Sequence, residues 1–143
     1  MFAKQLTVFI ENRTGRLSEV LSVLKNNGVN ILSLSLADTT EFGLLRLIVD
    51  NPEIGKEKLF ESGFSSLLSD VSIINISHAV GSLQALLKVI DEGGVNIEYM
   101  YGLSVDGDDA YIVLKTNDVE KTDAILSEHN IKTVPCDHIA KKK

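Results

Sequence analysis

The chain has 143 residues, of which 44% are hydrophobic and 24% are charged, and its formal net charge is −6 at pH 7. These proportions are typical of a globular protein. The negative charge argues against a nucleic-acid partner, because such a partner requires clustered cationic surface. No apolar stretch approaches the roughly 20 residues of a membrane-spanning helix, and a single cysteine excludes an internal disulfide. We therefore expect a cytoplasmic protein without a signal peptide that binds neither nucleic acid nor membrane.

The first half of the chain predicts the order strand, helix, hairpin, helix, strand. Leu6, Val8 and Ile10 alternate with other residues, which is typical of a half-buried strand, and the polar turn 11–15 follows. The next apolar residues are spaced i, i+3, i+4 and i+7, so they form one stripe on a helix that Asn27 and Gly28 close. These stripe residues are Leu17, Val20, Leu21 and Leu24.

After this helix the sequence predicts a hairpin and a second helix. Residues 31–36 and 44–49 are rich in aliphatic side chains, and a polar segment separates them. Asn51 then offers a helix cap with Pro52 at the first helical position, and Gly63 closes that helix. A short strand over 64–69 completes the order βαββαβ.

The second half repeats the first. Eight of the 17 residues from Gly15 to Ile31 recur 66 positions later, between Gly81 and Ile97. Self-similarity at a fixed period indicates a duplicated structural unit. The second copy predicts strands at 71–76, 97–103, 110–115 and 132–136, with helices that start near Ser82 and Asp118. Asp106 and Gly107 are expected to turn its hairpin.

The predicted fold is therefore α+β, with two tandem ferredoxin-like βαββαβ domains at 1–70 and 71–143. Each domain is expected to hold an antiparallel sheet with both helices on one face. No linker rich in Gly, Pro or Ser separates the halves, so Asp70 is the expected joint. A seam between twinned domains is a common place for a small ligand.

The strand-to-helix turns are the first candidate site, at residues 12–17 in one copy and 78–83 in the other. Free N–H groups at a helix start, reinforced by the helix dipole, attract a carboxylate or phosphate. Gly15 and Gly81 would let the backbone approach the ligand closely. The alternative is that these glycines only permit a tight turn, and the residues leave both interpretations open.

The segments Gly28-Val29-Asn30-Ile31 and Gly94-Val95-Asn96-Ile97 are the second candidate site. An asparagine at the start of a strand can donate and accept together, which suits a zwitterion. Alternatively, each asparagine serves only its own backbone, as turn asparagines usually do.

The turn at 11–17, followed by Gly-Val-Asn-Ile at 28–31, resembles the ACT domain, a small-molecule regulatory module of amino-acid metabolism. The chain from about residue 4 to 136 is similar to stand-alone tandem ACT proteins of bacteria. The resemblance implies sheets paired edge to edge, a homodimer, and a free amino acid bound between the turn of one domain and the second-strand start of its neighbour. On this basis the candidate ligand-binding residues are Asn12, Arg13, Thr14, Gly15, Arg16 and Leu17 with Asn96 and Ile97, and His78, Ala79, Val80, Gly81 and Ser82 with Asn30 and Ile31.

The two turns differ from the pattern of the family, which commonly has a proline just before the glycine. The first turn has Thr14 at that position, and the second has Val80 together with His78. These differences put the second site in doubt or give it a different ligand. His78 is a titratable group in a turn and could contact a ligand carboxylate or ammonium, although a solvated loop histidine is the simpler interpretation.

Signatures of catalysis and of metal binding are missing from the sequence. There is no GxxxxGK, GxSxG or HExxH motif. Cys136 and His138 flank Asp137, but the ligand set of a structural zinc site is incomplete. We expect no cofactor, no metal and no enzymatic activity. The leading hypothesis is an amino-acid sensor that acts in trans, with an enzyme of amino-acid metabolism as a possible partner. The alternative is an interaction module that keeps the fold without the ligand pocket.

Overall fold

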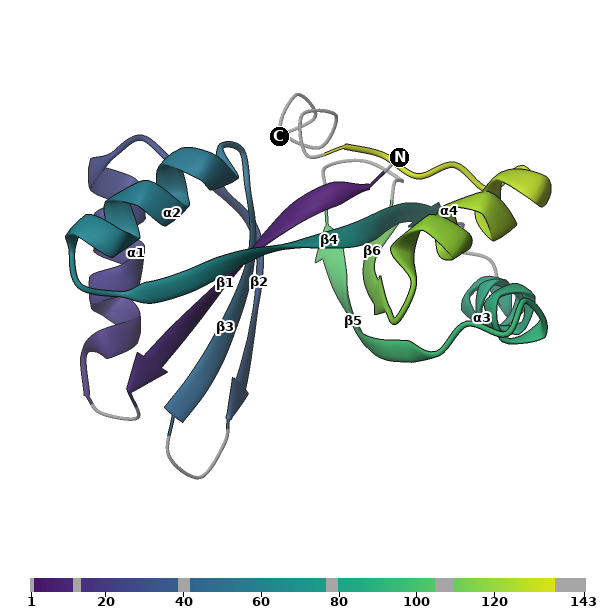
Figure 1. The fold of residues 1–143 in the computed structure, drawn as a ribbon, viewed down its shortest axis with the longest axis horizontal. Coiled ribbons are helices and arrows are strands. Elements are labelled where there is room, and N and C mark those ends of the chain that lie inside the picture. The colour runs from purple at the N-terminus through teal and green to yellow at the C-terminus, as the bar shows by residue number, and fades with distance from the viewer. Residues whose placement is uncertain (1, 12–13, 39–41, 77–79, 105–109, 136–143) are drawn as a thin grey trace. The chain divides into compact units, whose positions relative to one another are not determined.

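The computed structural model describes residues 2–11, 14–38, 42–76, 80–104 and 110–135 (Figure 1). The chain divides into two compact units. The first unit is Lys4–Ser69, and the second unit is Asp70–Lys143 together with Met1–Ala3. The predicted turn at Asp106 and Gly107 lies outside the described residues.

The first unit has the predicted order of elements. Its elements are β1 (Ala3–Glu11), α1 (Arg16–Asn26), β2 (Ile31–Asp38), β3 (Phe42–Val49), α2 (Pro52–Glu61) and the first residues of β4 (Ser65–Ile76). The sheet order is β2-β3-β1-β4, and β3 runs antiparallel to both β1 and β2. Leu6 is opposite Leu47 and Val8 is opposite Leu45, so these four side chains share one face of the sheet.

The second unit repeats the arrangement. It contains the remaining residues of β4, then α3 (Ser82–Glu92), β5 (Ile97–Ser104), β6 (Ala110–Thr116) and α4 (Val119–Glu128). The sheet order is β4-β6-β5, with β6 antiparallel to both neighbours. Each unit is therefore an α+β ferredoxin-like domain, and the predicted fold class is confirmed.

The helix boundaries follow local signals in the sequence. Asn51 and Asp118 cap α2 and α4, where their side chains accept hydrogen bonds from Ile54 N at 3.3 Å and Lys121 N at 3.0 Å. Such a cap satisfies one of the backbone donors that a helix start leaves over. Gly28 follows α1 with φ 70°, a conformation that glycine adopts at little cost. These boundaries agree with the sequence prediction.

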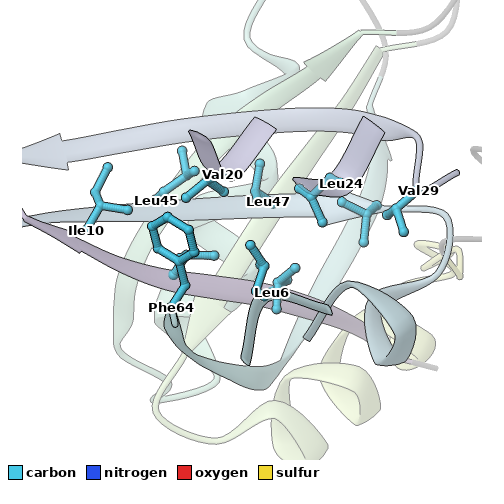
Figure 2. Packing of buried hydrophobic residues seen from close by; sticks show 11 residues of the cluster. Leu6, Ile10, Val20, Leu24, Val29, Leu45, Leu47 and Phe64 are labelled. Carbon is cyan, nitrogen blue, oxygen red and sulfur yellow. The ribbon is translucent and has the colours of Figure 1, made fainter. Parts of the chain in front are cut away.

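Both helices of the first unit cover the same face of its sheet, and the core lies between the two layers (Figure 2). Val20 and Leu24 come from α1 and Leu59 from α2, and all three are fully buried. They pack against the sheet face that carries Leu6 and Leu47. A matching cluster fills the second unit, with Leu86 and Ile90 from α3, Ile125 and Leu126 from α4, and Ile74 and Leu114 from the sheet.

Two predicted strand boundaries are wrong. The strands expected at 64–69 and 71–76 form the single strand β4, and the expected joint Asp70 lies inside it. Neither Ser69 nor Asp70 breaks a strand as Gly or Pro would, so the chain continues in the extended conformation. The expected last strand, 132–136, is reduced within the described residues to an isolated bridge between Thr133 and Ile74. Pro135 cannot donate to a strand ladder, which explains why pairing does not extend.

Candidate functional site

Each helix that follows the first strand of a unit begins at a glycine in the left-handed region. Gly15 (φ 88°) precedes α1 and Gly81 (φ 86°) precedes α3. Their carbonyl oxygens accept hydrogen bonds from Glu19 N and Ala85 N, both at 3.0 Å. A glycine has no side chain that could cap, and neither helix has a side-chain cap at this position. The first backbone N–H groups of both helices are therefore suited to bind an anion.

The charged side chain at the start of α1, that of Arg16, makes its contacts within the first unit. Arg16 Nη1 lies 2.7 Å from Glu19 Oε2. The guanidinium carbon of Arg16 also lies 4.3 Å from the centroid of the Phe64 ring, a cation–π contact. The Arg16 side chain is only 15% exposed. This predicted site residue therefore serves the packing of the first unit, and its charge is already paired.

The start of α3 lacks such a group and borders a hollow instead. Ser82 and Ala85 occupy the helix positions of Arg16 and Glu19, and the first turn of α3 has no acidic residue. A hollow of about 370 Å³ lies beside Ser82 and Ala85. We call it the α3 pocket. Its walls are largely aliphatic and come from β4, α3 and the segment after α4: Ile74, Ile76, Leu86, Val89 and Ile131.

Three polar residues also line the α3 pocket: Asn75, Ser82 and His129. His129 Nδ1 lies 2.9 Å from the carbonyl oxygen of Ile125. A carbonyl oxygen only accepts, so Nδ1 carries the proton and Nε2 is an acceptor in the neutral ring. Among the described residues that line this pocket, none is acidic and none is a lysine or arginine. The pocket thus combines apolar walls with the polar side chains of Asn75, Ser82 and His129.

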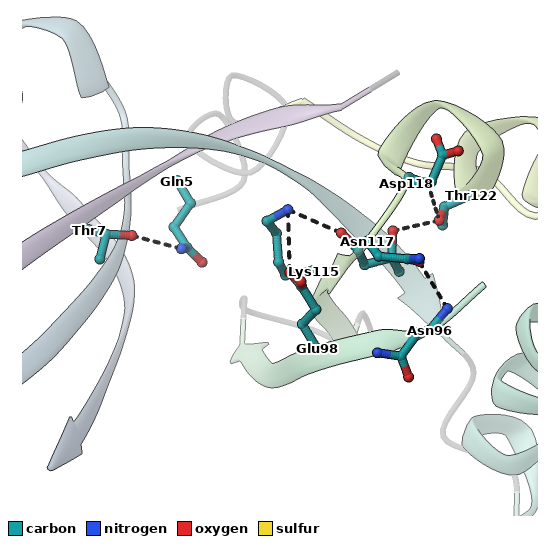
Figure 3. Close-up of polar contacts among 9 residues, drawn as sticks. Gln5, Thr7, Asn96, Glu98, Lys115, Asn117, Asp118 and Thr122 are labelled. Atoms are coloured by element: carbon teal, nitrogen blue, oxygen red, sulfur yellow. Dashed lines mark hydrogen bonds and ion pairs between the residues drawn. The ribbon is translucent and has the colours of Figure 1, made fainter. Parts of the chain in front are cut away.

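The asparagines at the strand starts are held by matching backbone contacts in the two units. Asn30 N donates to Asp50 Oδ1 at 2.9 Å, and Asp50 N donates to the Asn30 carbonyl at 3.1 Å. Asn96 and Asn117 make the same pair of contacts at 3.0 and 3.1 Å (Figure 3). Both asparagines are exposed, and neither side-chain amide hydrogen-bonds to another described residue. Their backbones are fixed while their amides face solvent.

A second hollow, of about 380 Å³, lies at the start of β2. It brings the predicted residues Asn30 and Ile31 together with Leu21 and Lys25 of α1. A carboxylate at this position would meet the Lys25 ammonium as well as an asparagine amide.

Within one unit the two candidate segments do not meet. Gly15 precedes α1 and Asn30 follows it, and the helix has 11 residues, which corresponds to about 16 Å. The same separation applies to Gly81 and Asn96 at the two ends of α3. A small ligand can contact both segments only if they come from two different units, as the sequence hypothesis requires.

The other predicted residues take several environments. Asn12, Arg13, His78 and Ala79 lie outside the described residues. Thr14 and Val80 are exposed. Three more are partly buried and pack against the core clusters: Leu17, Ile31 and Ile97.

The part of the α3 pocket that His129 and Ile131 line was not predicted from the sequence. His129 is the C-cap of α4, and neither His129 nor Ile131 was predicted as a site residue. A signal was present. The repeat has a period of 66 up to Asn96, yet Asn51 and Asp118, which both cap a helix, are 67 apart. A period of 67, but not one of 66, aligns Ile131 with Phe64. This alignment shows that the two side chains differ in size.

Comparison with known proteins decides the family. A family model of the ACT domain pair matches residues 1–142. The chain belongs to this ACT domain pair family.

One solved structure similar to this ACT pair is protein BT0572 from Bacteroides thetaiotaomicron, with 33% identity and a TM-score of 0.92 over 99% of this chain and 97% of that one. The ligand-free regulatory subunit of aspartate kinase from Thermus thermophilus has the same fold, with 16% identity and a TM-score of 0.64 over 89% and 90% of the two chains. Over 72 residues the ACT pair is 33% identical to the acetolactate synthase isozyme 3 small subunit of Escherichia coli. That match covers 50% of this chain and 43% of the relative, so less than half of the relative's length is matched.

The described part of the ACT pair contains no group of three or more His, Cys, Asp or Glu side chains placed to hold a metal ion. Cys136 and His138, which the sequence analysis considered for zinc, lie outside it. None of the helices that the structure describes has the length and apolar character needed to cross a membrane.

The left-handed glycines of the two ACT units give a testable stability effect. We expect Gly81→Ala to lower the free energy of unfolding by about 1–2 kcal/mol, because a Cβ disfavours positive φ. Space is not the cause, since a Cβ at Gly81 would meet no atom within 4 Å. Gly102→Ala is the matched control, because Gly102 also has open space and its φ lies outside the positive range. Urea unfolding followed by circular dichroism measures both, and equal effects would contradict the explanation.

Proposed function

We propose that this ACT pair is a non-catalytic regulatory protein that binds a free amino acid and acts in trans on another protein. The observation that carries the proposal is the pair of helix starts at Gly15 and Gly81, each without a side-chain cap, in a chain whose strand starts present the exposed amides of Asn30 and Asn96. The backbone N–H groups would bind the ligand carboxylate. An asparagine oxygen would accept from its ammonium.

Each proposed site combines elements of two units. One uses the turn 12–17 with Asn96 and Ile97, and the other uses the turn 78–82 with Asn30 and Ile31. Arg16 already contacts Glu19 and Phe64. Backbone N–H groups, rather than this guanidinium, would therefore bind the carboxylate in the first turn. Ligand binding would regulate a partner only by its difference in affinity for two arrangements of the protein.

The names of similar proteins support a regulatory role. One is the small subunit of acetolactate synthase, and another is the regulatory subunit of aspartate kinase. By analogy we propose that this ACT pair is cytoplasmic, forms a homodimer and associates with an enzyme of amino-acid metabolism. No catalytic role is proposed for any residue.

One observation favours the alternative function of an interaction module. Leu34 and Leu36 on the edge strand β2 are 47% and 50% exposed. They are two residues apart and therefore lie on the same face of the strand. An exposed apolar edge is a template for pairing with another chain, and this role requires no ligand.

A thermal-shift screen against the twenty amino acids at millimolar concentration tests the proposal. A ligand at 100 times its Kd adds about 2.7 kcal/mol to the free energy of unfolding, so the melting temperature should rise with selected amino acids. Asn96→Ala and Asn30→Ala should reduce the rise. Asn26→Ala, an exposed asparagine at the end of α1 outside the proposed sites, is the matched control. Flat curves across the panel would instead favour the interaction module.

A further inference from the structure

The α3 pocket has a counterpart in the first unit, which can be found from shared backbone features. Phe64 follows Gly63 (φ 87°), and its N–H donates to the Leu59 carbonyl at 2.8 Å. Ile131 follows Asn130 (φ 58°), and its N–H donates to the Leu126 carbonyl, also at 2.8 Å. Phe64 and Ile131 therefore occupy the same position in their units.

The helix starts correspond in the same way. Gly15 and Gly81 have nearly the same φ and accept the same helical hydrogen bond. Arg16 is thus the counterpart of Ser82, and Glu19 is the counterpart of Ala85.

At all three positions the first unit has the larger side chain. Arg16 contacts the other two residues, because it pairs with Glu19 and stacks on Phe64. Phe64 is only 4% exposed. In the second unit the smaller residues Ser82, Ala85 and Ile131 line a hollow of about 370 Å³. Side chains of the first unit therefore fill the place that is open in the second unit.

The lining of the α3 pocket indicates the chemistry of its occupant. An apolar cavity of about 150 Å³ already holds benzene, and ligand pockets commonly measure about 300–1,000 Å³. The aliphatic walls would remove apolar surface of a ligand from water. The described lining contains no Asp, Glu, Lys or Arg to pair with a charged ligand group, and an unpaired charge there would lose solvation. An uncharged aliphatic side chain fits best.

We propose that the α3 pocket binds the side chain of an aliphatic amino acid, and that the first unit cannot do so because Phe64, Arg16 and Glu19 fill the corresponding place. The inference rests on the proposed function, which supplies the amino-acid premise. The amino and carboxylate groups then lie toward the start of α3, where Ser82 borders the pocket. One aliphatic amino acid binds in this way per chain.

Isothermal titration and methyl NMR of the full chain test this inference, with L-leucine and L-lysine as probes. Of the two proposed sites, L-leucine should bind only the one at the start of α3, with one site per chain, and should shift the methyl signals of Ile74, Ile76 and Ile131. L-Lysine should bind at least about tenfold more weakly. Ile131→Phe introduces the first unit's residue into the pocket and should weaken L-leucine binding by about 10- to 100-fold, the loss expected when a leucine side chain stays in water.

Two further variants control the test. Ala85→Leu fills the pocket from the exposed side of α3 and should weaken binding without disturbing the core, which guards against a folding defect in Ile131→Phe. Ile54→Phe makes the same substitution at an exposed position of the first unit and should leave binding unchanged. Thermal unfolding without ligand verifies that each variant is folded.

The possible results separate the two proposals. Amino-acid binding that survives both pocket variants and leaves the three methyl signals unmoved would overturn the pocket and leave the proposed function standing. Two equivalent L-leucine sites per chain would overturn the inference that side chains fill the corresponding place in the first unit. Absence of binding by all twenty amino acids would overturn both the pocket and the proposed function.

Discussion

Phe64→Ala is expected to lower the free energy of unfolding of the first unit by about 3–5 kcal/mol, the range for truncation of a buried phenylalanine. Phe64 is 4% exposed and belongs to the core cluster of this unit (Figure 2). The substitution also removes the ring on which Arg16 stacks at 4.3 Å, a contact worth about 0.5–1 kcal/mol at an exposed site and more when desolvated. The Arg16 Nε atom is already buried without a hydrogen-bond partner, so after the substitution the guanidinium would keep its pair with Glu19 but lose its contact with the ring.

Urea unfolding monitored by circular dichroism measures this effect. Phe60→Ala is the matched control, because Phe60 is 78% exposed on α2 and a surface substitution of this kind usually changes stability by less than about 0.5 kcal/mol. A similar loss in both variants would contradict the role of Phe64 as the residue that fills the first unit.

Leu24→Ala is expected to cost about 2–5 kcal/mol, because it removes a buried leucine and leaves a cavity. Leu24 is fully buried on α1 and packs in the same cluster as Leu6, Val29 and Leu47 (Figure 2). Gly55 of α2 also approaches this region, since a Cβ added there would lie 3.4 Å from Leu24 Cδ2. Such close packing leaves little freedom for neighbours to collapse into the cavity, which favours the upper part of the range.

Thermal and urea unfolding of Leu24→Ala and of Ser22→Ala provide the test. Ser22 is exposed on the same helix, and alanine is the better helix former, so the control should be neutral or slightly stabilising. A loss below about 1 kcal/mol for Leu24→Ala would show that α1 is packed more loosely than the structure indicates.

Most helices and strands could be predicted because their signals are local. Asn51 with Pro52, and Asp118, mark helix starts through the chemistry of the cap. The apolar spacing of Val20 and Leu24 identifies the buried side of α1. The continuity of β4 through Asp70 was missed, because no local signal distinguishes a joint from an extended residue in the middle of a strand. For the last expected strand a local signal was present, because Pro135 has no backbone N–H to donate to a strand ladder.

The candidate site was predictable only in part. The glycines at 15 and 81 and the asparagines at 30 and 96 could be identified because they recur with a fixed spacing. That spacing does not show that Arg16 is turned toward Phe64, a contact between residues 48 positions apart in the chain. Arg16 was assigned to the ligand site through the family resemblance, which does not report that its charge is paired with Glu19.

The sequence by itself determined the duplication and the α+β class, because these depend on repeated residues and on hydrophobic spacing. The ACT family came from the resemblance of the segments 11–17 and 28–31 and from the match of the family model. Only the tertiary structure decided that the two copies differ in the space beside their helix starts. Ser82 and Ile131 border one pocket, yet they are far apart in sequence, and a cavity depends on the volumes of all the side chains that converge on it. No local sequence pattern gives the combined volume of these side chains, so the α3 pocket could be found only in the folded structure.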